Sequence, residues 1–199
     1  MKKEDNIVFI ESTEDLRRWL TKNHTSADSY WLVTWKRDSG GPYVNYNDVV
    51  DQLICFGWID SLPRKFDNKR TMLRISHRKP KSNWSKVNKE RVLRLEKAGL
   101  MEPSGLSAVE EAKKNGTWNF LDDVENLEIP HDLNLEFNKY PNSRYLFNRF
   151  PASSKRGILE WIKNAKTDAT RRKRIEETAA KAMKNIKANH PVGRSAGPK

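Results

Sequence analysis

The sequence predicts an α+β protein, with a small mixed or antiparallel sheet and packed helices followed by an all-helical C-terminal half. Runs of aromatic and β-branched residues, typical of strands, occur before residue 80 and alternate there with segments of helical period. From residue 131 onward only the helical period remains. Seven Trp, seven Phe and five Tyr supply the large side chains that a core needs.

The first elements are a strand, a helix and a second strand. Residues 7–10 form a short apolar run that predicts a strand. Ser12 then begins a helix as its N-cap, and Leu16 and Leu20 lie on the apolar stripe of that helix. Residues 30–35 are nearly all aromatic or β-branched without alternation, which predicts a strand buried on both faces.

A helix and a hairpin follow. Residues 46–56 show an apolar helical face, and Gly57 is a residue typical of the position after a helix. Residues 58–66 predict a strand, residues 67–70 a turn and residues 71–78 the return strand.

Helical patterns make up the remainder. Residues 84–98 predict a helix that stops at Gly99, and a second helix is expected over residues 107–115, where Ser107 resembles an N-cap. Residues 116–130 read as a connector, beyond which apolar residues continue at helical spacing.

These elements predict three parts of the chain. Residues 1–120 form an α+β domain and residues 121–189 a helical region, with the division inside the connector. Residues 190–199, rich in Gly and Pro, are expected to be a flexible tail.

Positive charge is concentrated in two stretches. The chain has 38 Lys and Arg against 26 Asp and Glu, a net charge of +12. Residues 64–97 hold 13 basic and 3 acidic residues, and residues 152–199 hold 13 and 4. Such a field attracts phosphorylated metabolites, nucleic acid or an acidic surface, unless the charges are only solvated helix faces.

Several classes of protein are excluded by absent patterns. No apolar run is long enough for a transmembrane helix or a signal peptide, so we expect a cytoplasmic protein. Cys55 stands alone between apolar residues, which predicts a buried thiol and excludes a disulfide within the chain. The nucleotide-binding and hydrolase motifs are absent and the four histidines share no ligand spacing, so we expect no cofactor and no metal.

The stretch from Cys55 to Asn88 carries the densest set of side chains suited to ligand binding. Arginine forks match phosphate and carboxylate groups, a helix N-terminus favours negative charge, and tryptophan rings offer stacking faces. We interpret the set as a pocket for a small anionic ligand, phosphorylated or carboxylate. Its candidate residues are Trp58, Asp60, Arg64, Arg74, Arg78, Trp84, Ser85 and Asn88.

The register of the hairpin decides whether these side chains meet. With a turn of residues 68–70, strand alternation places Asp60 opposite Arg78 and Arg64 opposite Arg74. A turn one residue longer exchanges the faces and dissolves the cluster. The alternative interpretation is structural: both tryptophans belong to the core, the serine is only a helix N-cap, and the arginines pair with nearby acids.

Two other functions have candidate residues. Sequence-nonspecific binding of nucleic acid would use the basic C-terminal helices, through Arg171, Arg172, Lys173 and Arg174. An enzyme acting on an anionic substrate would use Asp60 as its acid or base. No set of nucleophile, base and orienting group accompanies Asp60, so we assign no catalytic residue and favour a non-enzymatic protein.

Several motifs together resemble one family. They lie, in order, at residues 50–60, 74–80, 82–88, 99–105 and 156–175. This pattern resembles the YdeI/OmpD-associated family, also called the bacteriocin-protection family, over about residues 12–187. Ser61 departs from the glycine that the family usually shows after its F-G-W-I-D motif.

The resemblance implies no established reaction or substrate. The names of the family imply protection against antimicrobial peptides or stress, although a protein of net charge +12 repels cationic peptides. We therefore expect a cytoplasmic anion-binding or stress-protection protein, with nucleic-acid binding and an enzyme as the alternatives. The sequence gives no indication of the oligomeric state.

Overall fold

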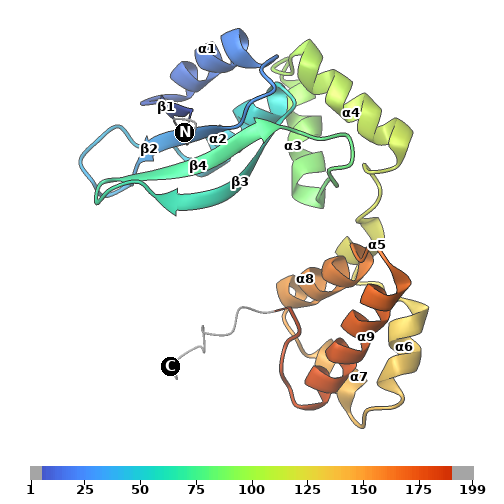
Figure 1. The fold of residues 1–199 in the computed structure, drawn as a ribbon. Helices are drawn as coiled ribbons and strands as arrows, with labels where there is room; N and C mark the ends of the chain where they lie inside the picture. The colour runs from blue at the N-terminus through green and yellow to red at the C-terminus, as the bar shows by residue number, and fades with distance from the viewer. Residues whose placement is uncertain (1–5, 190–199) are drawn as a thin grey trace, which may run out of the picture. The chain divides into compact units, whose positions relative to one another are not determined.

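The computed structural model describes residues 6–189 (Figure 1). The chain divides into two compact units, Met1–Phe120 and Leu121–Lys199, and each is described by itself. The predicted α+β class is confirmed, since a mixed four-stranded sheet and its helices are followed by helices alone. The tail expected at residues 190–199 lies outside the described residues.

The sheet of the N-terminal unit has the strand order β1-β2-β4-β3. Its strands are β1 (Ile7–Phe9), β2 (Tyr30–Trp35), β3 (Trp58–Lys65) and β4 (Arg70–His77). β1 pairs parallel with β2, and the other pairings are antiparallel. The parallel pair requires a crossover, which helix α1 (Thr13–Asn23) supplies.

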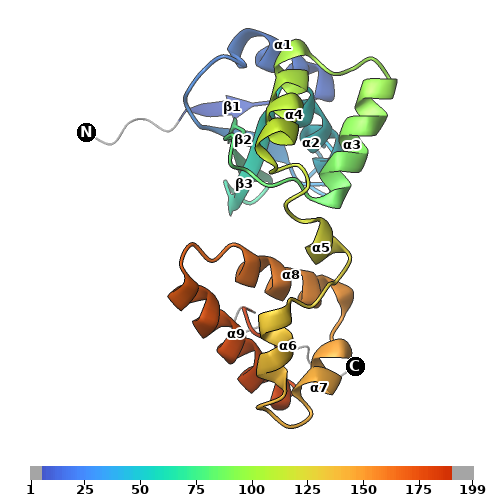
Figure 2. The same ribbon diagram turned by 90° about the vertical axis from the view of Figure 1, so that its right-hand side faces the viewer.

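The helices gather on one side of this sheet (Figure 2). α1 and α2 (Tyr46–Cys55) pack on each other, and α3 (Lys86–Lys97) and α4 (Pro103–Asn115) both pack on α2. Their apolar faces and the strand residues that point toward them form the main core. No described helix of this unit lies on the other face of the sheet.

Caps and glycines set the helix ends largely as predicted. Ser12 caps α1 by accepting a hydrogen bond from the Asp15 amide at 3.0 Å. Gly57 follows α2 with φ +74°, and a Cβ there would lie 2.9 Å from the Ser104 carbonyl oxygen. Only glycine meets both conditions at this position without strain.

Helix α4 begins four residues before its predicted start. Its first residue is Pro103 rather than Ser107, because proline has a fixed φ suited to the first helical position. The preceding Glu102 amide donates to the Cys55 carbonyl at 3.0 Å. Gly105 packs against the same carbonyl, since a Cβ there would lie 2.2 Å from its oxygen. The start of α4 is thus set by its contact with the end of α2.

The β3–β4 turn consists of residues 67–69 instead of 68–70. The amides of Phe66 and Asp67 donate to the Arg70 carbonyl at 3.3 and 3.2 Å. The Asp67 carboxylate accepts from the amides of Lys69 and Arg70 at 2.8 and 2.6 Å. An aspartate that bonds its own turn in this way fixes where the turn begins.

A β-bulge in β3 changes the register again. The pairing shifts between Asp60 and Pro63, where β3 contains one more residue than β4. Before the bulge Asp60 lies opposite Ile75, and beyond it Arg64 lies opposite Met72.

The predicted cross-strand pairs are therefore wrong: Arg78 is not opposite Asp60, and Arg74 is not opposite Arg64. The earlier turn and the bulge move the register in the same direction, so their effects add. Ser61, which replaces the family's usual glycine, lies inside the bulge, and its hydroxyl donates to the Arg74 carbonyl at 3.3 Å.

The C-terminal unit is helical. Its elements are α5 (Asp122–Glu125), α6 (His131–Phe137), α7 (Ser143–Asn148), α8 (Ala152–Lys163) and α9 (Asp168–Met183). α9 packs on α6, α7 and α8. Over residues 6–189, no helix has the length and hydrophobicity that crossing a membrane requires.

Candidate functional site

Both tryptophans of the expected pocket lie in the core. The Trp58 side chain is fully buried, with the rings of Trp19 and His77 at 5.7 and 5.0 Å. Trp84 is equally buried, and the Trp118 ring lies 5.2 Å away. Neither ring offers a face to a ligand, which agrees with the structural alternative for these two residues.

Arg78 is buried against Trp84. Its guanidinium group lies 3.8 Å from the Trp84 ring centroid, and Nη1 donates to the Asn83 carbonyl at 3.0 Å. Its Nε has no hydrogen-bond partner among the described residues. Burial lowers the pKa of Arg78 to about 10, although the charge of Asp60 acts in the opposite direction. Arg78 thus serves the packing of the loop that leads into α3.

The other members of the expected pocket lie apart from this pair. Asp60 accepts a hydrogen bond from the Tyr46 hydroxyl at 2.8 Å. Arg74 is exposed and donates to the Ser29 hydroxyl at 3.1 Å. Arg64 lies 5.0 Å from the ring of Trp31. The side chains that would have formed one pocket are therefore divided between the two faces of the sheet.

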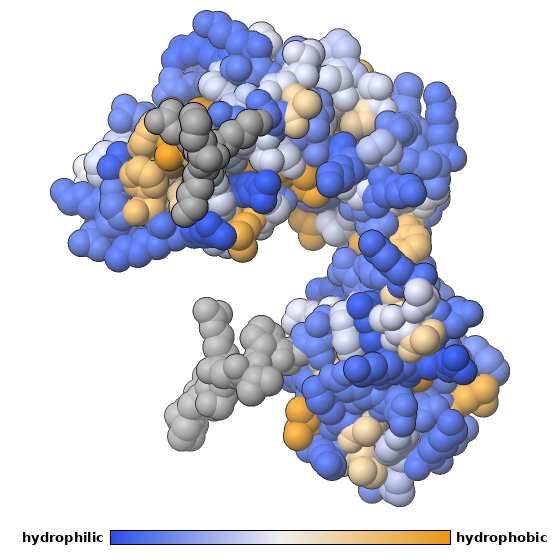
Figure 3. Space-filling view, in the orientation of Figure 1, coloured by the Kyte–Doolittle hydropathy of each residue, from blue (hydrophilic) through white to orange (hydrophobic). Residues whose placement is uncertain are grey.

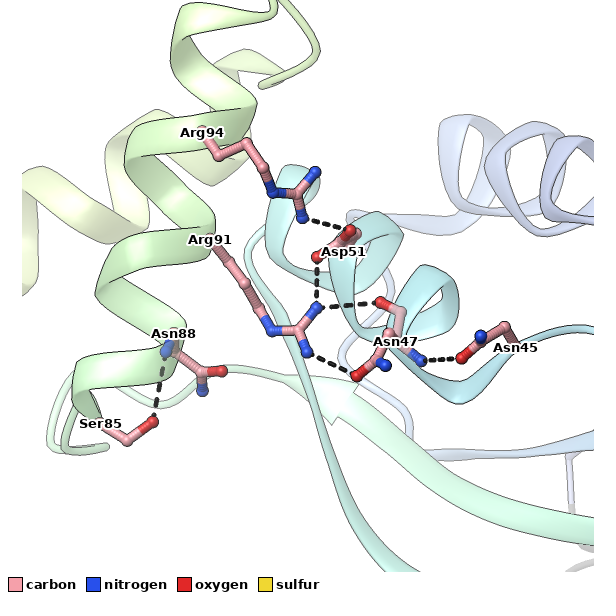
Figure 4. A network of polar contacts seen from close by, with 7 residues as sticks. All are labelled: Asn45, Asn47, Asp51, Ser85, Asn88, Arg91 and Arg94. Carbon is pink, nitrogen blue, oxygen red and sulfur yellow. Dashed lines mark hydrogen bonds and ion pairs between the residues drawn. The ribbon is translucent and has the colours of Figure 1, made fainter.

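Ser85 and Asn88 meet at the start of α3 (Figure 4). Ser85 is the N-cap and accepts a hydrogen bond from the Asn88 amide at 3.3 Å. The serine oxygen therefore satisfies one amide that a ligand would otherwise use.

A polar cluster that the sequence did not reveal joins α2 to α3 (Figure 4). Asp51 is buried and accepts hydrogen bonds from Arg91 at 2.6 Å and from Arg94 at 2.5 Å. Arg91 also donates to the Asn47 side-chain oxygen at 2.7 Å. The two arginines are three residues apart and share one helix face, but no local pattern in the sequence identifies the helix they face. Because the Asp51 carboxylate accepts hydrogen bonds from two arginines of α3, its role is to hold α2 against α3.

The open face of the sheet is the second feature that the sequence did not reveal. Strand alternation directs Ile7 and Phe9 of β1, and Trp31, Val33 and Trp35 of β2, away from the helices. None of these residues belongs to the main core cluster, whereas the intervening Leu32 does. Trp31 and Val33 are nevertheless buried, with 9% and 1% of their surface exposed. Phe9 is 56% exposed. Apolar side chains reach the surface near β1 and β2 (Figure 3).

Arginines lie over the aromatic rings of this face. Besides Arg64 on Trp31, the Arg70 guanidinium group lies within 6 Å of three ring centroids. These rings are Phe66 at 4.8 Å, Phe9 at 5.4 Å and Trp35 at 5.7 Å. Arg70 is also paired with Asp67 at 2.7 Å, whereas Arg64 and Arg74 form no ion pair among the described residues. The face therefore combines cations with aromatic surface.

The candidate cations of α9 have different surroundings. Arg171 binds Asp132 with two hydrogen bonds, at 2.7 and 3.0 Å. Arg174 donates to the Trp161 carbonyl and lies 4.9 Å from the ring of that residue. Arg172 and Lys173 are exposed. Two of the four candidate cations are thus held by neighbours in their own unit.

Metal-ligating side chains do not cluster in the described part of the chain. Over residues 6–189, no group of three or more His, Cys, Asp or Glu is placed to hold a metal ion. Cys55 is buried, and burial raises the pKa of its thiol.

Two family models match the chain. A domain of unknown function (DUF8412) matches residues 8–108, and the model described as "Bacteriocin-protection, YdeI or OmpD-Associated" matches residues 126–185. No curated protein and no solved structure matches. The first match covers half of the chain and contains the sheet except for Ile7, and the second contains α6 to α9. By the match over half of its length, the chain belongs to the family of the domain of unknown function DUF8412, and the match over residues 126–185 confirms the predicted resemblance to the bacteriocin-protection, YdeI or OmpD-associated family in that segment.

Proposed function

We propose that the N-terminal unit is a non-enzymatic anion-binding module whose ligand is single-stranded nucleic acid, bound across the open face of the sheet. The observation that carries this proposal is the combination of arginines and aromatic rings on that face. Guanidinium groups bind phosphates, and aromatic rings stack on bases of any identity. Residues 64–97, which include β4 and α3, add a net charge of +10 to the attraction.

The aromatic surface favours a single strand over a duplex. Bases of a duplex are stacked on each other and cannot reach the rings of a protein. Phe9 is the ring most open to such a base, because more than half of its surface is exposed. Arg64 and Arg74 lie on the same face and can turn toward phosphates, since neither is held by a carboxylate among the described residues.

The proposal includes no catalytic step and implies a cytoplasmic protein. The earlier candidate for an acid or base, Asp60, is hydrogen-bonded to Tyr46 on the helix-covered side of the sheet. A protective role of the kind that the family description names would act through nucleic acid. Direct capture of cationic peptides is opposed by the net charge of +12.

Fluorescence anisotropy with a labelled single strand and the corresponding duplex, at several salt concentrations, tests the proposal. We expect tighter binding of the single strand, and a fall of about 0.7 log unit in affinity per decade of salt for each phosphate contacted. Phe9→Ala should weaken binding roughly tenfold at all salt concentrations, because one stacked base is lost. Arg64→Gln should instead reduce the salt slope by about one phosphate contact.

Arg172→Gln on α9 is the matched control. It removes the same charge from an exposed arginine in the other unit, and its affinity should stay within about twofold of the unmodified protein. If Arg172→Gln loses affinity and Arg64→Gln does not, the nucleic acid binds the C-terminal helices. If the single strand does not bind near physiological salt, the proposal is wrong.

A further inference from the structure

A cleft lies on the helix-covered side of the sheet, at the N-terminal end of helix α2. The eight-residue strands β3 and β4 extend roughly 26 Å, whereas the ten residues of α2 span roughly 15 Å. Part of the hairpin therefore continues past the helix. The segment leading into α2 forms the other wall and leaves a volume of about 440 Å³. This volume falls in the range of pockets that hold small molecules.

The walls of the cleft are mostly apolar. Leu32 of β2 and Leu73 of β4 form its floor, and Pro63 of β3 lies beside them. Tyr43 and Val44 line it from the segment that precedes α2. A ring or short aliphatic body would replace water against these side chains.

The charged side chains that line the cleft are those of Asp60 and Lys36. The Lys36 ammonium group is held by the carbonyls of Asp67 and Asn68, to which it donates at 3.2 and 2.9 Å, whereas the Asp60 carboxylate is paired with no charged group in the described part of the chain.

The Asp60 Oδ2 accepts the hydroxyl of Tyr46, and burial together with this contact raises the pKa of Tyr46 to about 12, so that Tyr46 remains a neutral donor. Among residues 6–189, Asp60 forms no ion pair within 4.0 Å. By contrast, Asp51, Asp67 and Asp132 each hold at least one arginine.

We propose that this cleft binds a small amine with an aromatic or aliphatic ring, whose ammonium group pairs with Asp60 while the ring lies on Leu32 and Leu73. The apolar walls select the body of the ligand, and the Asp60 carboxylate, with which Arg78 interacts only beyond ion-pair distance, selects its charge. A carboxylate ligand of the same shape is repelled by Asp60. The proposal does not rest on nucleic-acid binding, because Asp60, Leu32 and Leu73 lie on the helix-covered side of the sheet. Trp35 at the end of β2 is the ring that lines the cleft and also lies near Arg70.

Three probes of similar size with the same ring test the charge preference: 2-phenylethylamine, 2-phenylethanol and phenylacetate, each titrated by isothermal calorimetry and ligand-observed NMR. We expect the amine to bind at least tenfold more tightly than phenylacetate, with the alcohol between them. In Asp60→Asn the amine should lose about tenfold in affinity and the alcohol should keep its own. Equal binding of amine and carboxylate, or a preference that survives in Asp60→Asn, would overturn the proposal.

Leu73→Trp fills the cleft and should abolish binding of all three probes. Leu93→Trp makes the same change at an exposed position of α3 outside the cleft and should leave binding unaltered. Circular dichroism of each variant checks the fold, and Asp60→Asn decides the matter if Leu73→Trp misfolds. Undiminished binding to a folded Leu73→Trp, or no binding of any probe at about 10 mM, contradicts the proposal. The oligonucleotide affinity of Asp60→Asn should stay unchanged, which separates this test from that of the proposed function.

Discussion

The two basic stretches of the chain are almost equal in charge and differ in how their cations are held. Residues 64–97 have a net charge of +10 and residues 152–199 of +9. In the first stretch Arg78 lies under a buried tryptophan and Arg91 binds a buried carboxylate. In the second, Arg171 binds a carboxylate near the surface. Two stretches of nearly equal net charge therefore hold their arginines differently. In the first the partner group is buried, and in the second it lies near the surface.

Burial also predicts how much each contact stabilises its unit. The side chain of Asp51 is 13% exposed, whereas that of Asp132 is 45% exposed. Removing one partner of a buried pair leaves the other charged group without compensation, at a cost of about 3–5 kcal/mol. Exposed pairs are screened by water and salt and contribute about 0–1 kcal/mol. The following substitutions test this difference in order of expected effect.

The largest effect is expected for Asp51→Ala. It leaves Arg91 without its carboxylate at the α2–α3 contact, so unfolding of the N-terminal unit should cost about 3–5 kcal/mol less. Urea unfolding followed by tryptophan fluorescence measures it, because six of the seven tryptophans lie before residue 121. Arg94→Ala should cost clearly less, since the Arg94 side chain is 58% exposed. A loss below 1 kcal/mol for Asp51→Ala would show that burial does not separate the two stretches.

How much of the fold is predictable depends on the range of the interactions that fix it. Ser12 and Gly57 mark helix ends by their own chemistry, so those ends follow from the sequence. The start of α4 does not, because it depends on the packing of Gly105 against a distant carbonyl. The predicted register of the hairpin was also wrong, because Asp67 sets an earlier turn and the bulge near Ser61 adds one residue to β3. Neither feature has a period that alternation could reveal.

The second substitution compares two arginines that lie on tryptophan rings. Arg78→Lys keeps the charge but loses the flat stacking on Trp84 at 3.8 Å and the bond to the Asn83 carbonyl. We expect a loss of about 1–2 kcal/mol in the unfolding free energy. Arg174→Lys, over the half-buried Trp161 at 4.9 Å, should cost less. Thermal and urea unfolding of the two variants give the comparison, and a larger loss for Arg174→Lys would reverse it.

The candidate site was less predictable than the fold. Strand alternation correctly separated the two faces of β4, but the bulge in β3 puts Asp60 and Arg64, which alternation placed together, on opposite faces. Alternation also could not tell which face the helices would cover. Trp58 and Trp84 were therefore candidates for stacking, whereas the most exposed ring on the open sheet face is that of Phe9. The Asp51 cluster and the Asp60–Tyr46 contact join segments whose approach is set by helix packing. Charge and aromatic content were visible in the sequence, and their arrangement required the fold.

The smallest effect is expected at Asp132, and it depends on pH. Hydrogen bonds from Arg171 hold the pKa of Asp132 below its usual value of 3.8. The carboxylate thus favours the folded state above pH 4, and this contribution disappears as the pH falls through the lowered pKa. Because the side chain is 45% exposed, the contribution at neutral pH should be only about 0.5–1 kcal/mol. The difference in unfolding free energy between the protein and Asp132→Asn, measured by circular dichroism in urea, should be constant from about pH 5 to 7. It should shrink below about pH 4 and weaken in about 1 M salt. If the difference in unfolding free energy persisted unchanged at low pH, Asp132 would act through packing and not through its charge. The contrast with the buried Asp51 pair would then rest on Asp51→Ala alone.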